Sequence, residues 1–144
     1  MPVELTISSA ELNRFNRDID KYSKEVQEKC KKEVARTVYS VHNKAVRNAP
    51  RKFSILATSI QPIIYGNSLT GEVKVGAKYG PYQEFGTGKR VRVPAGYEAL
   101  AWQFKGRGIR EVNIDPHPYL IPAVEDERQR FLDNIKKALN ENTQ

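Results

Sequence analysis

The feature that most constrains this sequence is a long run of apolar residues spaced three or four positions apart. It comprises Leu12, Phe15, Ile19, Tyr22, Val26, Cys30, Val34, Val38, Val41 and Ala45. This spacing puts every member on one face of an α-helix, so it predicts an amphipathic helix packed against a core. Ser8 and Glu11 form a capping box at its start. Pro50 ends the helix near Asn48, because the residue before a proline avoids helical geometry.

The length of this predicted helix is itself informative. About 40 residues of helix would span roughly 60 Å, whereas a compact chain of 144 residues has a radius of gyration near 15 Å. We therefore expect the helix to bend, with Asp18–Asp20 as a plausible place, or to pack part of its apolar face on another subunit.

The middle of the chain predicts a small antiparallel sheet. Pro62–Tyr65 and Glu72–Gly76 flank the turn-rich Gly66–Gly71, which is typical of a β-hairpin. A third strand is predicted at Ile109–Ile114. Ser54–Ile60 fits either two turns of helix or the start of a strand, and the sequence leaves both open.

A second helix is predicted from Tyr119 onward. Its apolar face carries Leu120, Val124, Phe131, Ile135 and Leu139. Pro122 lies in the first turn, where its missing N–H is not needed. The predicted fold class is therefore α+β, with a long N-terminal helix and a C-terminal helix packed on one face of a small antiparallel sheet.

The positive charge of the chain is concentrated in one window. The net charge is +7, and between Lys89 and Arg110 six cations stand against Glu98 alone. Two interpretations stay open: a solvated loop, or an electrostatic footprint for phosphates or an acidic protein face. The aromatic residues Tyr97, Trp102 and Phe104 lie among these cations, which suits base stacking or a protein–protein interface equally.

Several chemical classes are not supported. Two histidines, His42 and His117, and the single Cys30 cannot form a four-ligand zinc site or an internal disulfide. No strained serine elbow for a hydrolytic triad is visible. We expect no catalytic residue, metal or cofactor, and Cys30 fits a small core residue. No apolar run of eighteen residues suggests a membrane span, and the N-terminus does not resemble a signal peptide, which favours a cytoplasmic protein.

The densest group of turn-forming residues is Tyr79–Gly88, with sequence Tyr-Gly-Pro-Tyr-Gln-Glu-Phe-Gly-Thr-Gly. Pro81 and the flanking glycines argue against a regular helix or strand, so we predict a turn of defined geometry. Glu84 is expected to accept hydrogen bonds from backbone amides of this turn, or to pair with an arginine.

Two motifs carry a family resemblance: Tyr-x-x-Tyr-x-Glu-Phe-Gly-Thr at Tyr79–Thr87, and Pro-Tyr-Leu-Ile-Pro-Ala at Pro118–Ala123. With the long first helix and the two strands before them, they resemble the tail-completion or head–tail joining proteins of long-tailed bacteriophages and prophages, roughly from Leu12 to Leu139. The resemblance implies one domain over residues 1–144, with loop 86–113 projecting. It also implies a non-enzymatic virion protein of the tail or neck, assembled as a ring, commonly hexameric, around the DNA channel.

On this resemblance the expected partners are other copies of the chain, tail-tube and head-connector proteins, and non-specifically the DNA in the channel. No membrane contact is expected, and assembly is expected in the host cytoplasm. Contacts with a neighbouring subunit or ring are predicted for Tyr79, Tyr82, Glu84, Phe85, Gly86, Thr87, Trp102 and Phe104. A role facing the DNA lumen or an acidic partner is predicted for Lys89, Arg90, Arg92, Lys105, Arg107 and Arg110. A small basic nucleic-acid-binding module is the alternative.

Overall fold

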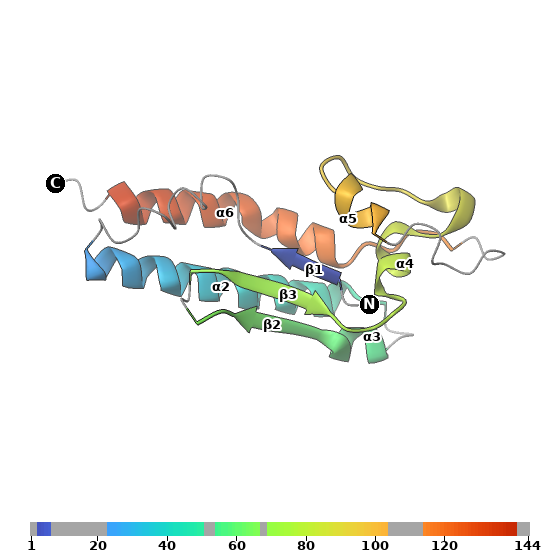
Figure 1. Cartoon of the computed structure of the whole chain (residues 1–144), viewed down its shortest axis with the longest axis horizontal. Helices are drawn as coiled ribbons and strands as arrows, with labels where there is room; N and C mark the ends of the chain where they lie inside the picture. Colours follow the sequence, from blue (N-terminus) through green and yellow to red (C-terminus); the bar gives the residue numbers. More distant parts are fainter. Residues whose placement is uncertain (1–2, 7–22, 51–53, 67–68, 104–113, 141–144) are drawn as a thin grey trace.

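The computed structural model of the chain describes residues 3–6, 23–50, 54–66, 69–103 and 114–140. Two long helices dominate it: α2 spans Lys24–Asn48 and α6 spans Leu120–Asn140. They run antiparallel and side by side along the longest axis (Figure 1). A three-stranded antiparallel sheet lies against α2. The α+β fold class predicted from the sequence is confirmed.

Helix α2 begins at Lys24, whereas the predicted helix starts near Ser8. Ser23 is its N-cap, with extended backbone (φ −63°, ψ 157°), and the Val26 N–H donates to Ser23 Oγ at 3.3 Å. A helix running unbroken from Ser8 is therefore wrong, because the extended Ser23 interrupts it. The capping box of Ser8 and Glu11 and the proposed bend at Asp18–Asp20 lie outside the described residues.

The end of α2 agrees with the sequence. Ala49 caps the helix, and its N–H donates to Ala45 O at 2.9 Å before Pro50 leads the chain away. The described helix has 25 residues, which corresponds to about 38 Å. A helix of this length does not extend beyond a compact fold of this size.

The sheet has strand order β1-β3-β2. β2 (Ile60–Ile64) and β3 (Gly71–Val75) form the predicted hairpin, with Ile60 opposite Val75. Over the described residues, the third strand is a segment that the sequence analysis did not single out. It is β1 (Val3–Thr6), which pairs with the other edge of β3. Ile114 is not in a strand, and residues 109–113 lie outside the described part of the chain.

Ser54–Ile60 combines the two alternatives left open by the sequence. Helix α3 spans Ser54–Ser59, and β2 follows at once from Ile60. The change of structure is fixed by Ser59, whose hydroxyl donates to Leu56 O at 2.7 Å and accepts from the Ala77 N–H at 3.1 Å.

The core lies between α2, α6 and the inner face of the sheet. Its fully buried side chains include Cys30, Val38, Val41, Leu56, Val73, Val75 and Ala123. Cys30 is a core residue, as predicted, and burial raises the pKa of its thiol. Over the described residues no helix is both long and apolar enough to cross a membrane. Phe85, Tyr97 and Ile121 form a second, smaller apolar cluster, and Leu100 packs against both this cluster and the core.

Candidate functional site

The predicted turn at Tyr79–Gly88 contains a short helix. α4 spans Gly80–Phe85, and a 3-10 turn, η2, follows at Gly88–Arg90. The prediction that Pro81 excludes a helix here is wrong, because a proline in the first turn has no N–H that the helix would need. Gly86 ends α4 at φ 79°. A Cβ on Gly86 would lie 2.8 Å from Ile114 O, so this position requires glycine.

Glu84 lies on α4, and its carboxylate binds the start of α6. It is only 5% exposed and accepts hydrogen bonds from the backbone N–H groups of Tyr119 (2.8 Å), Leu120 (2.9 Å) and Ile121 (2.9 Å). The first N–H groups of a helix have no partner within it, and a negative charge at this end is favourable. Burial raises the pKa of the Glu84 carboxyl, and these three hydrogen bonds oppose the rise.

The expected partners of Glu84 therefore need correction. It does accept from backbone amides, but they begin 35 residues further along the chain rather than in its own turn. The turn and the start of α6 meet at one end of the helix pair, near α3 (Figure 1). This long-range contact could not be read from local sequence.

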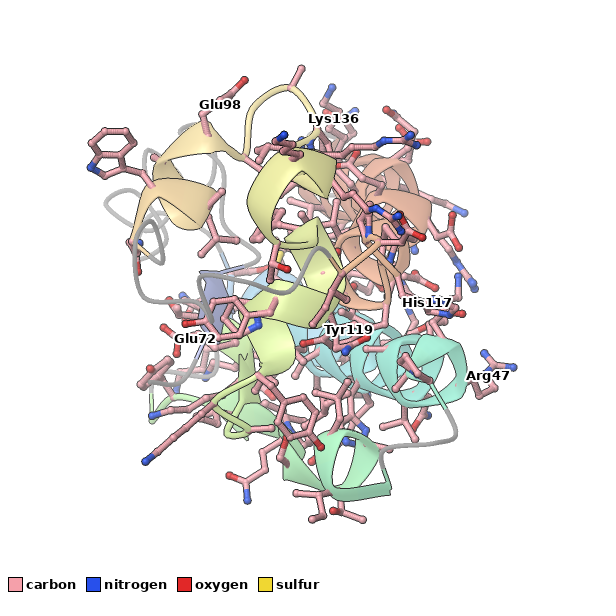
Figure 2. All side chains as sticks on the ribbon, turned by 90° about the vertical axis from the view of Figure 1, so that its right-hand side faces the viewer. Arg47, Glu72, Glu98, His117, Tyr119 and Lys136 are labelled. Carbon is pink, nitrogen blue, oxygen red and sulfur yellow. The ribbon has the colours of Figure 1, made fainter. Side chains whose placement is uncertain are left out.

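Tyr119 makes a second link between the same two segments. Its hydroxyl donates to Gly80 O at 3.1 Å, and only 1% of the residue is exposed. Burial and the nearby Glu84 raise the pKa of Tyr119. A Cβ on Gly80 would lie 2.9 Å from this hydroxyl, so the small residue makes room for the tyrosine. Figure 2 shows Tyr119 near the centre of this end of the molecule, with Glu98 and Arg47 at its periphery.

Further backbone hydrogen bonds complete this connection. The His117 N–H donates to Gln83 O at 2.6 Å, and the Thr87 N–H donates to Ile114 O at 3.0 Å. The Ile114 N–H donates in return to Thr87 Oγ1 at 2.9 Å. We call residues 79–87 and 114–121 together the joint. The two sequence motifs thus form one hydrogen-bonded unit.

The chain between the two halves of the joint adds another helix that the sequence analysis did not predict. α5 spans Glu98–Trp102. Its residues Leu100 and Ala101 pack, with Val93, around the cluster of Phe85, Tyr97 and Ile121. The first part of this segment is tied to α4, because the Arg92 N–H donates to Phe85 O at 2.8 Å.

The predicted interface residues fall into two groups. Glu84, Phe85, Gly86 and Thr87 are buried inside the chain itself, whereas Tyr79 and Tyr82 are half-buried and Trp102 is 67% exposed. Phe104 lies outside the described residues. Contact with a neighbouring subunit stays a prediction for all of them, and the exposed Trp102 offers the most surface for it.

The predicted basic loop is described only at its start. Lys89, Arg90 and Arg92 are exposed. Arg90 Nη1 lies 2.9 Å from Asp115 Oδ2, but both side chains are more than half exposed, so this ion pair contributes little stability. Lys105, Arg107 and Arg110 lie outside the described residues.

A second buried carboxylate, Glu127 on α6, was missed as a special residue by sequence reasoning. Its side chain is 3% exposed and lies 3.0 Å from Lys44 Nζ and 3.1 Å from Arg36 Nη1. The Ser40 hydroxyl donates to it at 2.6 Å. Burial alone would raise the pKa of Glu127, but hydrogen bonds from Ser40, Lys44 and Arg36 lower it to about 2.

A sequence signal for Glu127 did exist. It continues the apolar spacing between Val124 and Phe131, so a carboxylate stands on the buried face of α6. Both buried glutamates, Glu84 and Glu127, are thus engaged in holding α6 to α4 and to α2. Within the described ranges, no group of three or more metal-binding side chains is clustered.

A comparison with family models identifies the family of this chain. The model described as "Bacteriophage HK97-gp10, putative tail-component" matches residues 13–86, which is just over half of the chain and includes all but the last residue of the first motif. Comparisons with curated proteins and with solved structures gave no significant match. The chain belongs to the HK97-gp10-like family of bacteriophage tail components.

Proposed function

We propose that this protein is a non-enzymatic structural component of a phage or prophage virion that completes or joins the tail at the head–tail interface. It acts there as one subunit of an oligomeric ring, with six copies as the expected number. Its partners are other copies of itself, tail-tube proteins and head-connector proteins. The proposal builds on membership of a tail-component family.

The observation that carries the proposal is the joint. Glu84 and Tyr119 fix α4 to the first turn of α6 with hydrogen bonds of 2.8–3.1 Å. The exposed cations Lys89, Arg90 and Arg92 follow directly. The start of the basic segment, which we define as Lys89–Arg110, is thereby held at one end of the pair of long helices. Such a support suits a protein that must present one surface in a fixed orientation.

The charge of this segment favours an acidic surface opposite it. The window from Lys89 to Arg110 carries a net charge of +5. Copies of it brought together in a ring would repel one another unless phosphate or acidic side chains faced them. Either the DNA in the channel or an acidic neighbouring ring would supply that charge.

The non-enzymatic part of the proposal is supported by how the buried reactive groups are used. Glu84 is engaged by three backbone amides, and Glu127 by Ser40, Lys44 and Arg36. The Cys30 thiol lies in the apolar core, where burial raises its pKa and so disfavours the reactive thiolate. Each group has a structural explanation that needs no substrate.

Charge reversal of the basic segment tests the proposal. Arg90, Arg92, Arg107 and Arg110 are changed together to glutamate in the phage or prophage that encodes the chain. Infectious particles are then counted, and heads and tails are imaged by electron microscopy. We expect unjoined heads and tails while the purified variant keeps its circular dichroism spectrum.

The matched control reverses four exposed cations on the helix pair: Lys32, Arg130, Lys136 and Lys137. It changes the net charge by the same amount and should leave joining intact. Normal particle yield from the variant at the basic segment would overturn the proposed role of that segment. Strongly salt-dependent DNA binding by the isolated chain, without any effect on particles, would favour the nucleic-acid-binding alternative instead.

A further inference from the structure

The segment that includes α5 has one buried side chain among its described residues, Tyr97. In the described segment 88–103, Tyr97 is the one side chain that is buried, at 8% exposed. Its ring packs with Phe85 of α4 and Ile121 of α6. Its hydroxyl donates to the carboxylate of Glu125 on α6. Burial and this hydrogen bond raise the pKa of Tyr97 to about 12, so the hydroxyl is a donor at neutral pH.

The residues around Tyr97 are less buried, although Leu100 packs against the main core as well as against the small cluster. Pro94, Ala95 and Gly96 are exposed, and Val93, Leu100 and Ala101 are only half-buried. Gly96 has φ 92°, and nothing lies within 4 Å of a Cβ built on it, so the turn before Tyr97 borders open space. Trp102, at the end of α5, is 67% exposed.

The chain immediately before this segment is fixed independently. Thr87 and Ile114 exchange two hydrogen bonds, and the Arg92 N–H donates to Phe85 O. None of these bonds involves residues 93–103. The attachment of the basic residues 89–92 therefore does not depend on whether Tyr97 is in place.

We propose that residues 93–103 form a strap, closed by Tyr97, that opens while the joint and the α2–α6 pair stay folded. Parts of a protein with few buried contacts open at a lower free-energy cost than the whole. Over its described residues the strap has one buried side chain, Tyr97, beside the half-buried Val93, Leu100 and Ala101, whereas the helices and the sheet share a continuous core. Opening would uncover Phe85 and Ile121 and move Trp102 outward.

An open strap would give Trp102 a second position, against a neighbouring subunit. That use rests on the proposed function, but the opening itself does not. It can therefore be measured on the isolated full-length chain, and a failure there would leave the proposed function untouched.

Limited proteolysis with chymotrypsin tests the strap, since Leu100 and Trp102 are cleavage sites within it. Cleavage of the closed form tracks the small fraction of open molecules. For Tyr97→Ala we expect cleavage at these sites to rise at least about tenfold, and for Tyr97→Phe about two- to fivefold, because only the hydroxyl is lost. Tyr39→Ala is the matched control, since Tyr39 is an exposed tyrosine on α2.

Sites outside the strap decide whether the opening is local. Trypsin cleavage at Lys89, Arg90 and Arg92 and chymotrypsin cleavage at Phe131 should keep their wild-type rates. Unchanged cleavage at Leu100 and Trp102 in both variants would overturn the proposal. So would equal acceleration at every site, or a Tyr97→Ala chain that loses its fold, because strap and body would then be one cooperative unit.

Discussion

Helix α6 is held at two places, by two buried glutamates that are stabilised in opposite ways. Between the two long helices, Glu127 of α6 meets two cations of α2, Arg36 and Lys44, whose side chains remain about 30% exposed. At the joint, Glu84 meets three backbone N–H groups. Hydrogen bonds from Ser40, Lys44 and Arg36 outweigh burial and lower the pKa of Glu127 to about 2, whereas burial leaves the pKa of Glu84 raised.

This difference separates the roles of the two regions. The cations around Glu127 reach solvent, so they can be rehydrated if the carboxylate is lost. The N–H groups at the start of α6 are buried and fixed by the helix, so they have no alternative partner. We therefore expect the helix pair to tolerate change better than the joint does.

Removing each carboxylate in turn should show the difference between the two regions most clearly. Glu84→Ala leaves three buried donors unsatisfied, and we expect it to lower the free energy of unfolding by about 3–5 kcal/mol. For Glu127→Ala we expect a smaller loss of about 1–3 kcal/mol, because Arg36 and Lys44 regain water. Urea unfolding at pH 7 measures both. An equal or larger loss for Glu127→Ala would contradict the assignment of the joint as the less tolerant region.

The pH dependence of stability should separate the two glutamates by sign. The pKa of Glu127 falls from 4.5 to about 2 on folding. Its ionisation therefore adds up to about 3 kcal/mol above pH 4.5, and this is lost as the pH falls towards 2. The pKa of Glu84 is raised on folding, so its contribution is complete below pH 4.5 and declines as the pH rises through the raised value.

Glutamine variants identify the two contributions in unfolding curves measured from pH 2 to pH 7. Glu127→Gln should remove most of the loss of stability below pH 4.5. Glu84→Gln should leave the loss of stability below pH 4.5 unchanged and should reduce the decline of stability at higher pH. If Glu127→Gln still loses stability below pH 4.5, other carboxylates cause that loss.

Two glycines provide a finer comparison, one in the joint and one in the strap. Gly86→Ala would bring a Cβ to 2.8 Å from Ile114 O and 3.0 Å from Arg90 O, at φ 79°. We expect a loss of about 2–3 kcal/mol, since backbone atoms cannot move aside as a side chain can. Gly96→Ala meets open space at φ 92° and should lose about 1 kcal/mol. Thermal unfolding measures both variants, and equal losses of stability would argue against tight packing at Gly86.

Elements that depend on local sequence were predicted well. The apolar spacing identified most of α2 and α6, the proline at position 50 marked the end of α2, and the turn-rich Gly66–Gly71 marked the hairpin. The start of α2 was misjudged because Ser8 and Ser23 both precede helical spacing, and only the backbone conformation of Ser23 distinguishes them.

The site was harder to predict because its contacts are long-range. The motifs containing Glu84 and Tyr119 were both recognised, but nothing in either motif states that one caps the other. The pairing of β1 with β3 could not be predicted from local sequence either, because it joins residues 3–6 to residues 72–75. Tyr97 was noted only as one of several aromatic residues, because its burial depends on Phe85 and Ile121 meeting in space.

Sedimentation of the purified chain with and without tail tubes of the encoding phage tests the central claim most directly. We predict that the chain pellets with the tubes, and that charge reversal at Arg90, Arg92, Arg107 and Arg110 keeps it in the supernatant. Self-association without tubes is not required, since a ring can form on its template. A wild-type chain that stays in the supernatant with tubes present, and shows no self-association, would contradict a role in tail completion.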